Sequence, residues 1–167
     1  MSKTTCGLLF DSSVLFDIQN ASIFGYVSIF PHKLLVTDII LSNELETIEA
    51  TTLLNFGFQS VQLNPEEMSA LQSYRICYNA LSIGDLSCLV YAENNNNIMI
   101  VAGDRDLRAL ALQKHIRVHG SLWILDELIE HGIMPTPKAV AALKLMLEHG
   151  ARLPKHECDM RLRIWNG

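Results

Sequence analysis

Four acidic side chains on four separate segments could do chemistry together: Asp11, Glu44, Asp85 and Asp104. Asp11 and Asp104 follow the apolar runs "GLLF" and "IMIVAG". Glu44 and Asp85 are expected on helices, with apolar residues three or four positions away, so both carboxylates should face inward. Carboxylates that meet in one place repel one another and must be compensated. The pattern therefore predicts an acidic pocket that needs a cation.

The ligand type narrows the choice of cation. A site made only of oxygen ligands favours Mg²⁺ or Mn²⁺ over zinc. Such an ion lowers the pKa of a bound water and stabilises a phosphoryl transition state. A simpler interpretation stays open for three of the acids, since Asp11 and Asp104 could act only as N-caps and Asp85 could cap a helix after Gly84. Asp106 is expected to interact favourably with the dipole at the N-terminus of its helix.

Short apolar runs alternate with longer segments of helical period. Strands are expected at 7–10, 33–36, 58–63, 98–102 and 116–119. Helices are expected from Ser12, at 23–30, from Thr37 or Asp38 to about Asn55, from Asn64, at 83–93, up to about Lys114, at 121–131 and at 137–149. This order predicts an α/β fold, a three-layer α/β/α sandwich with a mostly parallel central sheet. In such sheets, sites form beyond the carboxyl ends of the strands, where Asp11 and Asp104 fall.

Composition limits the class of protein. The chain has 167 residues, 49% of them hydrophobic, and a net charge of −5, which suits one folded domain. Its apolar runs fall short of the roughly 20 residues that span a bilayer, and "MSKTTCGLLFDSS" lacks the features of a signal peptide. The four cysteines show neither C-x-x-C nor zinc-finger spacing. We expect reduced thiols, no membrane association and a cytoplasmic location.

Charge is unevenly distributed along the chain. Residues 138–167 hold six Lys or Arg and three Asp or Glu, a net of +3, which leaves −8 for the remainder. Residues 1–150 are expected to form the domain, and residues 151–167 a basic C-terminal tail that belongs to the same unit or binds a partner. Such a tail is either an ordinary solvated end or an arm that contacts phosphates. Trp165 in "RLRIWNG" is a candidate for stacking on bases, whereas Trp123 is expected to be partly core.

The ordered set of acids resembles the PIN domain. The matching motifs are Asp11 after the first strand, Glu44 in "TDIILSNEL", Asp85 in "LSIGDLSCLVYA" and Asp104 in "IMIVAGDRDLRALA". The stretch from Leu81 to Met134, with "GSLWILDELIEHGIM", is similar to the C-terminal half of stand-alone prokaryotic PIN proteins, and the resemblance covers residues 7 to about 150. In that family the four matching acids bind Mg²⁺ or Mn²⁺ and hydrolyse RNA phosphodiesters. Many of these proteins are similar to toxins of toxin–antitoxin pairs.

The resemblance implies a metal-dependent endoribonuclease, with RNA, an antitoxin protein and a second copy of the chain as expected partners. The catalytic and metal-binding residues would be Asp11, Glu44, Asp85 and Asp104. The substrate-binding residues would be Ser12, Ser13, Arg105 and Arg108. One departure is Ala102, where the family usually carries Thr or Ser, although Ser12 or Ser13 could supply the hydroxyl.

Two other interpretations compete with the nuclease. The first is a PIN-like module that binds RNA or a protein partner without cutting. The second is a receiver-type signalling module, which would need paired acids after the first strand and a Lys at a late strand end, and the sequence has neither.

Overall fold

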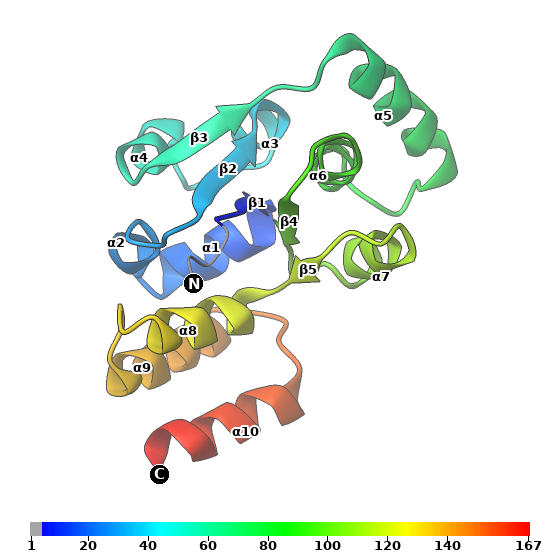
Figure 1. Cartoon of the computed structure of the whole chain (residues 1–167). Coiled ribbons are helices and arrows are strands. Elements are labelled where there is room, and N and C mark those ends of the chain that lie inside the picture. Colours follow the sequence, from blue (N-terminus) through cyan, green and yellow to red (C-terminus); the bar gives the residue numbers. More distant parts are fainter. Residues whose placement is uncertain (1–4) are drawn as a thin grey trace.

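A five-stranded sheet lies at the centre of the computed structural model, which describes residues 5–167 (Figure 1). The strands are β1 (Gly7–Phe10), β2 (Lys33–Thr37), β3 (Phe58–Val61), β4 (Ile98–Val101) and β5 (Val118–His119). Every pairing is parallel and the order is β3-β2-β1-β4-β5. The predicted α/β/α sandwich with a parallel sheet is confirmed.

Ten helices surround the sheet in the described part of the chain. They are α1 (Ser12–Asn20), α2 (Phe24–Val27), α3 (Asp38–Asn43), α4 (Ala50–Asn55), α5 (Pro65–Cys77), α6 (Ile83–Asn94), α7 (Arg105–Gln113), α8 (Ser121–Glu130), α9 (Thr136–Glu148) and α10 (Lys155–Asn166). Helices α1, α8 and α9 pack together on one side of the sheet, whereas α3, α5 and α7 contact α6 on the other (Figure 1). The sheet is therefore covered on both faces.

The central strands are apolar because both of their faces are buried. All four residues of β1 are buried, and Leu9 lies between Leu35 of β2 and Ile100 of β4. The carboxyl ends of β1 and β4 stay level, since Phe10 pairs with Val101. The residues that follow these two strands consequently leave the sheet at the same edge.

The predicted helix from Thr37 to about Asn55 is wrong in its continuity. The Thr37 hydroxyl caps α3 by accepting from the Ile40 N–H, but α3 ends at Asn43 and α4 begins only at Ala50. Helix α1 contacts the connection between α3 and α4. The Gln19 side chain donates to the Thr47 carbonyl and accepts from the Thr47 hydroxyl. The residues between α3 and α4 are thus tied to α1.

The C-terminal residues form a helix that packs on the domain. Helix α10 lies against α9, and its residue Cys158 is buried. The Arg161 guanidinium holds Asp126 of α8 at 2.7 Å, and Trp165 is partly buried against the core. Strand β5 is shorter than the predicted 116–119, because its ladder with β4 is confined to Val118 and His119.

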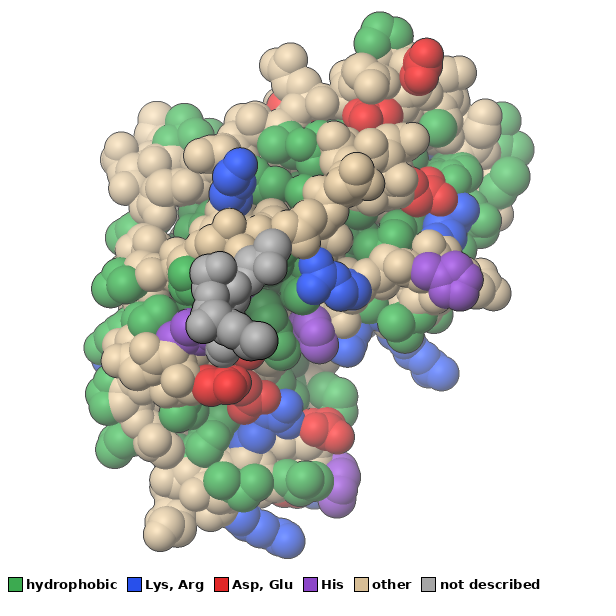
Figure 2. All heavy atoms as spheres, viewed as in Figure 1, with side chains coloured by type: hydrophobic (Ala, Val, Ile, Leu, Met, Phe, Trp, Pro, Cys, Tyr) green, Lys and Arg blue, Asp and Glu red, His purple; other side chains and the backbone are tan. Residues whose placement is uncertain are grey.

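The cysteines, the helix lengths and the surface charges can be compared with the expectations from composition. All four cysteines are free thiols. Within residues 5–167, no helix combines the length and apolar character needed to cross a membrane. On the face shown in Figure 2, acidic and basic side chains are interspersed. Residues 1–4, which begin the segment judged unlike a signal peptide, lie outside the described residues.

Candidate active site

Asp11 leaves the end of β1 and begins α1. Its carboxylate accepts from the Val14 N–H at 3.0 Å and from the Ser13 hydroxyl at 2.8 Å, and only 1% of the residue is exposed. Burial raises the pKa of Asp11 to about 7, and the Asp85 carboxylate raises it in the same direction. Asp11 is therefore an N-cap, and it is also an acid that keeps its proton to near neutral pH.

Asp104 follows the adjacent strand β4 and begins α7. Its carboxylate accepts from the Leu107 N–H at 2.8 Å. The Gly103 N–H before it donates to the Ser13 hydroxyl at 3.1 Å, and that hydroxyl donates to Asp11. A Cβ at Gly103 would lie 2.8 Å from this hydroxyl oxygen, so glycine permits the approach. Ser13 thereby joins the ends of the two central strands.

Glu44 is the C-cap residue that follows α3, whereas the sequence predicted it inside a longer helix. Its carboxylate is nevertheless directed inward and bridges two elements: Oε1 accepts from the Gly84 N–H of α6 and Oε2 from the Ser12 hydroxyl of α1, both at 2.9 Å. A Cβ on Gly84 would overlap the Glu44 carboxylate. Gly84 is thus needed for this carboxylate to reach the start of α6.

Asp85 lies in the first turn of α6, where it forms a capping box with Ser82. The Ser82 hydroxyl accepts from the Asp85 N–H at 3.0 Å, and Asp85 Oδ2 accepts from the Ser82 N–H at 3.1 Å. The N-cap is therefore Ser82 and not Asp85, contrary to the simpler interpretation. Burial raises the pKa of Asp85 to about 6, and the carboxylates of Asp104 and Glu44 add to the increase.

The four acids Asp11, Glu44, Asp85 and Asp104, here called the acidic cluster, share one electrostatic neighbourhood. Besides the effects on Asp11 and Asp85, three of them act on the buried thiol of Cys88. The pKa of this thiol is raised well above its usual range by burial and then by Asp11, Asp85 and Glu44. Within the described residues, no Lys or Arg forms an ion pair with any member of the acidic cluster.

The acidic cluster has the right ligand atoms for a hard cation, but its side chains are not arranged around a common metal position. Among residues 5–167, no group of three or more His, Cys, Asp or Glu side chains is arranged to hold a metal ion. Each carboxylate also accepts a backbone N–H. The two oxygens of a carboxylate have about four lone-pair sites, so each side chain can still bind a cation. Mg²⁺ typically takes one or two carboxylates and several waters. Uncompensated oxygen ligands of this kind fit Mg²⁺ or Mn²⁺.

Sequence reasoning missed Asp17, which lies one helical turn after Ser13 on α1. Its carboxylate accepts from the Ser121 hydroxyl of α8 at 2.6 Å, and burial raises its pKa. Asp17 and Asp104 line the same cavity of about 380 Å³. The spacing of four from Ser13 was the available signal, because such residues share a helix face.

A buried hydroxyl pair beneath the acidic cluster was also missed. The Ser87 hydroxyl donates to the Gly84 carbonyl at 2.6 Å, so the Thr37 hydroxyl, 2.8 Å away, donates to Ser87. Both residues are fully buried. This pair fixes the first turn of α6, and hence Asp85, against the end of β2.

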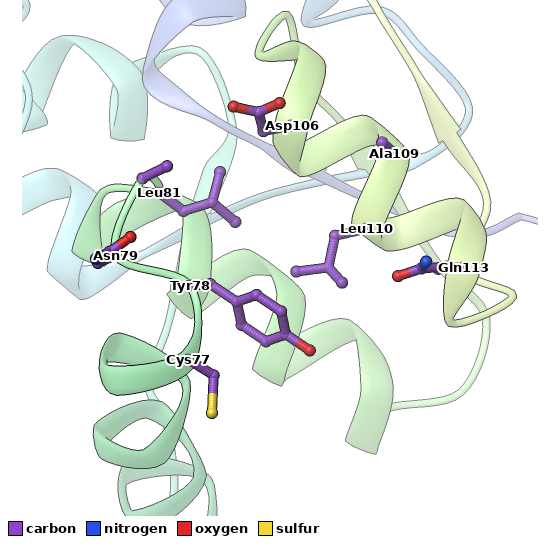
Figure 3. Close-up of a pocket in the computed structure, with 9 residues that line it drawn as sticks. Cys77, Tyr78, Asn79, Leu81, Asp106, Ala109, Leu110 and Gln113 are labelled. Carbon is purple, nitrogen blue, oxygen red and sulfur yellow. The ribbon is translucent and has the colours of Figure 1, made fainter.

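The remaining candidates separate into different surroundings. Arg105 is exposed at the start of α7, whereas Arg108 is half-buried and its guanidinium lies beside Gly120. Ala102 is fully buried, and its N–H donates to the His119 carbonyl. Asp106 lines a different cavity of about 340 Å³ with Tyr78, between the α5–α6 connection and α7 (Figure 3).

Comparison with known proteins gives one match. A family model described as a PIN domain matches residues 8–167, nearly the whole chain. No curated protein and no solved structure gives a significant match.

Proposed function

Because the chain belongs to the PIN-domain family, whose members are generally nucleases, we propose that it is a Mg²⁺- or Mn²⁺-dependent endoribonuclease. The observation that carries the proposal is the acidic cluster. Four separate elements supply its carboxylates. The Asp85 carboxylate raises the pKa of Asp11, and the carboxylates of Asp104 and Glu44 raise that of Asp85. Within the described residues, none of the four has a Lys or Arg partner. A divalent cation relieves such a concentration of charge.

In this proposal Asp11, Glu44, Asp85 and Asp104 hold one or two metal ions. When bound, the metal supplies an acidified water and neutralises charge on the phosphoryl group. Ser12 and Ser13 orient the carboxylates of Glu44 and Asp11, to which their hydroxyls donate. Arg105 and Arg108, at the start and in the second turn of α7, bind phosphate oxygens of the RNA.

Ionisation of the acidic cluster is coupled to metal binding. With a pKa of about 7, Asp11 is half-protonated at neutral pH, and Asp85 with a pKa of about 6 is mostly ionised. A ligating carboxylate must be deprotonated, so metal affinity rises with pH and binding releases protons.

We place the nuclease in the cytoplasm, as the toxin of a toxin–antitoxin pair that also forms a homodimer. Large apolar side chains on the surface support contact with a protein partner. Ile76 at the end of α5 is 83% exposed and Leu112 on α7 is 64% exposed. These two side chains are the positions at which we expect a protein partner to make contact.

The second candidate is a PIN-like module that binds RNA or a protein partner without cutting it. Two observations favour it. The side chains of the acidic cluster are not arranged as a ready metal cage in the described residues, and Ala102 offers no hydroxyl at its position.

The test is cleavage of single-stranded RNA with Mn²⁺ or Mg²⁺. We expect cleavage that stops with EDTA and is lost in Asp85→Asn, while the circular dichroism spectrum stays native. The matched control is Asp106→Asn, which makes the same charge change at an exposed position of the neighbouring helix. RNA that stays intact with metal present, but still binds, favours the non-catalytic module instead.

A further inference from the structure

A groove leads away from the acidic cluster along α7 and α8. One cavity, of about 380 Å³, is lined by Ser13, Asp17 and Asp104. A second cavity, of about 400 Å³, is lined by Arg108, His119 and Trp123. Residues Gly103, Arg152 and Leu153 line both cavities. The two cavities therefore adjoin, and together they form what we call the α7–α8 groove.

Two positive charges in the α7–α8 groove are not neutralised. Within the described residues, Arg108 and Arg152 form neither an ion pair nor a side-chain hydrogen bond. Arg161, which also lines the groove, is instead engaged by Asp126 at 2.7 Å and by Glu157 at 2.9 Å. Two arginines are thus available for an anionic ligand, close to a cluster that would itself repel one.

The same groove has an aromatic wall. The rings of His119 and Trp123 stack, with centroids 4.8 Å apart and an interplanar angle of 12°. Both residues are half-buried and line the cavity, so part of each side chain remains accessible. Burial, followed by the charges of Arg108 and Arg117, lowers the pKa of His119, which favours the uncharged ring. The wall therefore offers a neutral stacking surface.

Unpaired arginines beside stacked rings are the combination that binds single-stranded nucleic acid, where cations meet phosphates and rings meet bases. We propose that the α7–α8 groove binds the nucleotides that flank the scissile phosphate of a single-stranded RNA. Arg108 and Arg152 contact backbone phosphates, and a base packs against the Trp123–His119 wall. The position of the scissile phosphate rests on the proposed nuclease function, whereas strand binding in the groove does not require cleavage.

The test measures binding without catalysis. The probe is a single-stranded RNA with 2′-O-methyl groups, titrated into the full chain in EDTA at several salt concentrations. Each phosphate contact on a single strand contributes about 0.7 to the slope of log K against log[salt]. We expect Arg108→Ala and Arg152→Ala each to lower the slope by about this amount. The control Arg75→Ala, on the exposed part of α5 and outside the groove, should leave it unchanged.

The aromatic wall has its own readout. The chain has two tryptophans, so Trp165→Phe leaves Trp123 as the one indole fluorophore. We expect the probe to quench this variant. We also expect Trp123→Leu, which keeps an apolar side chain, to weaken binding about tenfold or more. If Trp123→Leu does not fold, the quenching in Trp165→Phe still decides the matter.

The outcomes separate the two proposals. Equal salt slopes for Arg108→Ala and Arg75→Ala, or fluorescence of Trp123 that does not respond to the probe, overturn the groove assignment. RNA cleavage by wild type with groove variants unchanged in KM and probe affinity overturns the groove alone. Binding with the expected slopes but no cleavage in Mn²⁺ supports the groove and overturns the nuclease.

Discussion

Replacement of Asp11 by Asn should stabilise the metal-free protein while it removes metal binding. The pKa of Asp11 is raised from 3.8 to about 7, so between these pH values the folded chain binds more protons than the unfolded chain. Stability therefore falls as pH rises through this window, by up to about 4 kcal/mol once Asp11 is ionised. An Asn amide oxygen can still accept from the Val14 N–H but carries no charge.

The assay is thermal unfolding of both proteins between about pH 4 and pH 8, with EDTA or with Mn²⁺. In EDTA the melting temperatures should coincide near pH 4, where both side chains are neutral, and diverge to about 10 °C in favour of Asp11→Asn at pH 8. Mn²⁺ should raise the melting temperature of wild type by mass action and leave the variant unchanged. Asp106→Asn, on an exposed side chain, controls for the change in net charge. A native-like variant that melts no higher than wild type at pH 8 would refute the argument.

Three further predictions concern the acidic cluster and its support. Gly84→Ala introduces a Cβ into the space of the Glu44 carboxylate and should reduce RNA cleavage at least about tenfold with the fold retained, whereas Gly25→Ala, which meets no atom within 4 Å, should cleave normally. Thr37→Val removes the cap on Ile40 and the hydrogen bond to Ser87, and urea unfolding should show a loss of about 2 kcal/mol, against less than about 0.5 for the exposed Thr51→Val. Cleavage at saturating RNA and fixed Mn²⁺ should rise from about pH 5 to about pH 8. The reason is that Asp85 and Asp11, with pKa values of about 6 and about 7, must ionise to bind metal. A flat profile would contradict the assignment of these two acids.

Asp11 and Asp104 could be located from the sequence because each follows a strand that is apolar throughout, and parallel strands deliver such residues to one edge. Glu44 was expected to face inward, and it does so by another route. The chain leaves α3 at this residue, and Gln19 of α1 hydrogen-bonds Thr47 in the connection that follows. Such a contact between distant segments has no local pattern.

The α7–α8 groove lay beyond prediction for a similar reason. Its walls come from α1, the starts of α7 and α8, the connection after α9, and α10, which are distant from one another in the sequence. Arg152 and Trp123 were visible in the sequence only as a tail charge and a core aromatic residue. Only the fold shows which arginines lack a carboxylate partner. Arg161 lines the same groove but forms ion pairs with Asp126 and Glu157.

Each carboxylate of the acidic cluster accepts a backbone N–H at the start of a helix. A descendant that gave up its chemistry could not simply discard these side chains, since its helices would lose their first hydrogen bonds. It could exchange Asp for Asn or Ser and keep its architecture intact. We expect a related chain without catalytic activity to lack the negative charge at these positions but to keep a capping oxygen there. Its fold would be unchanged.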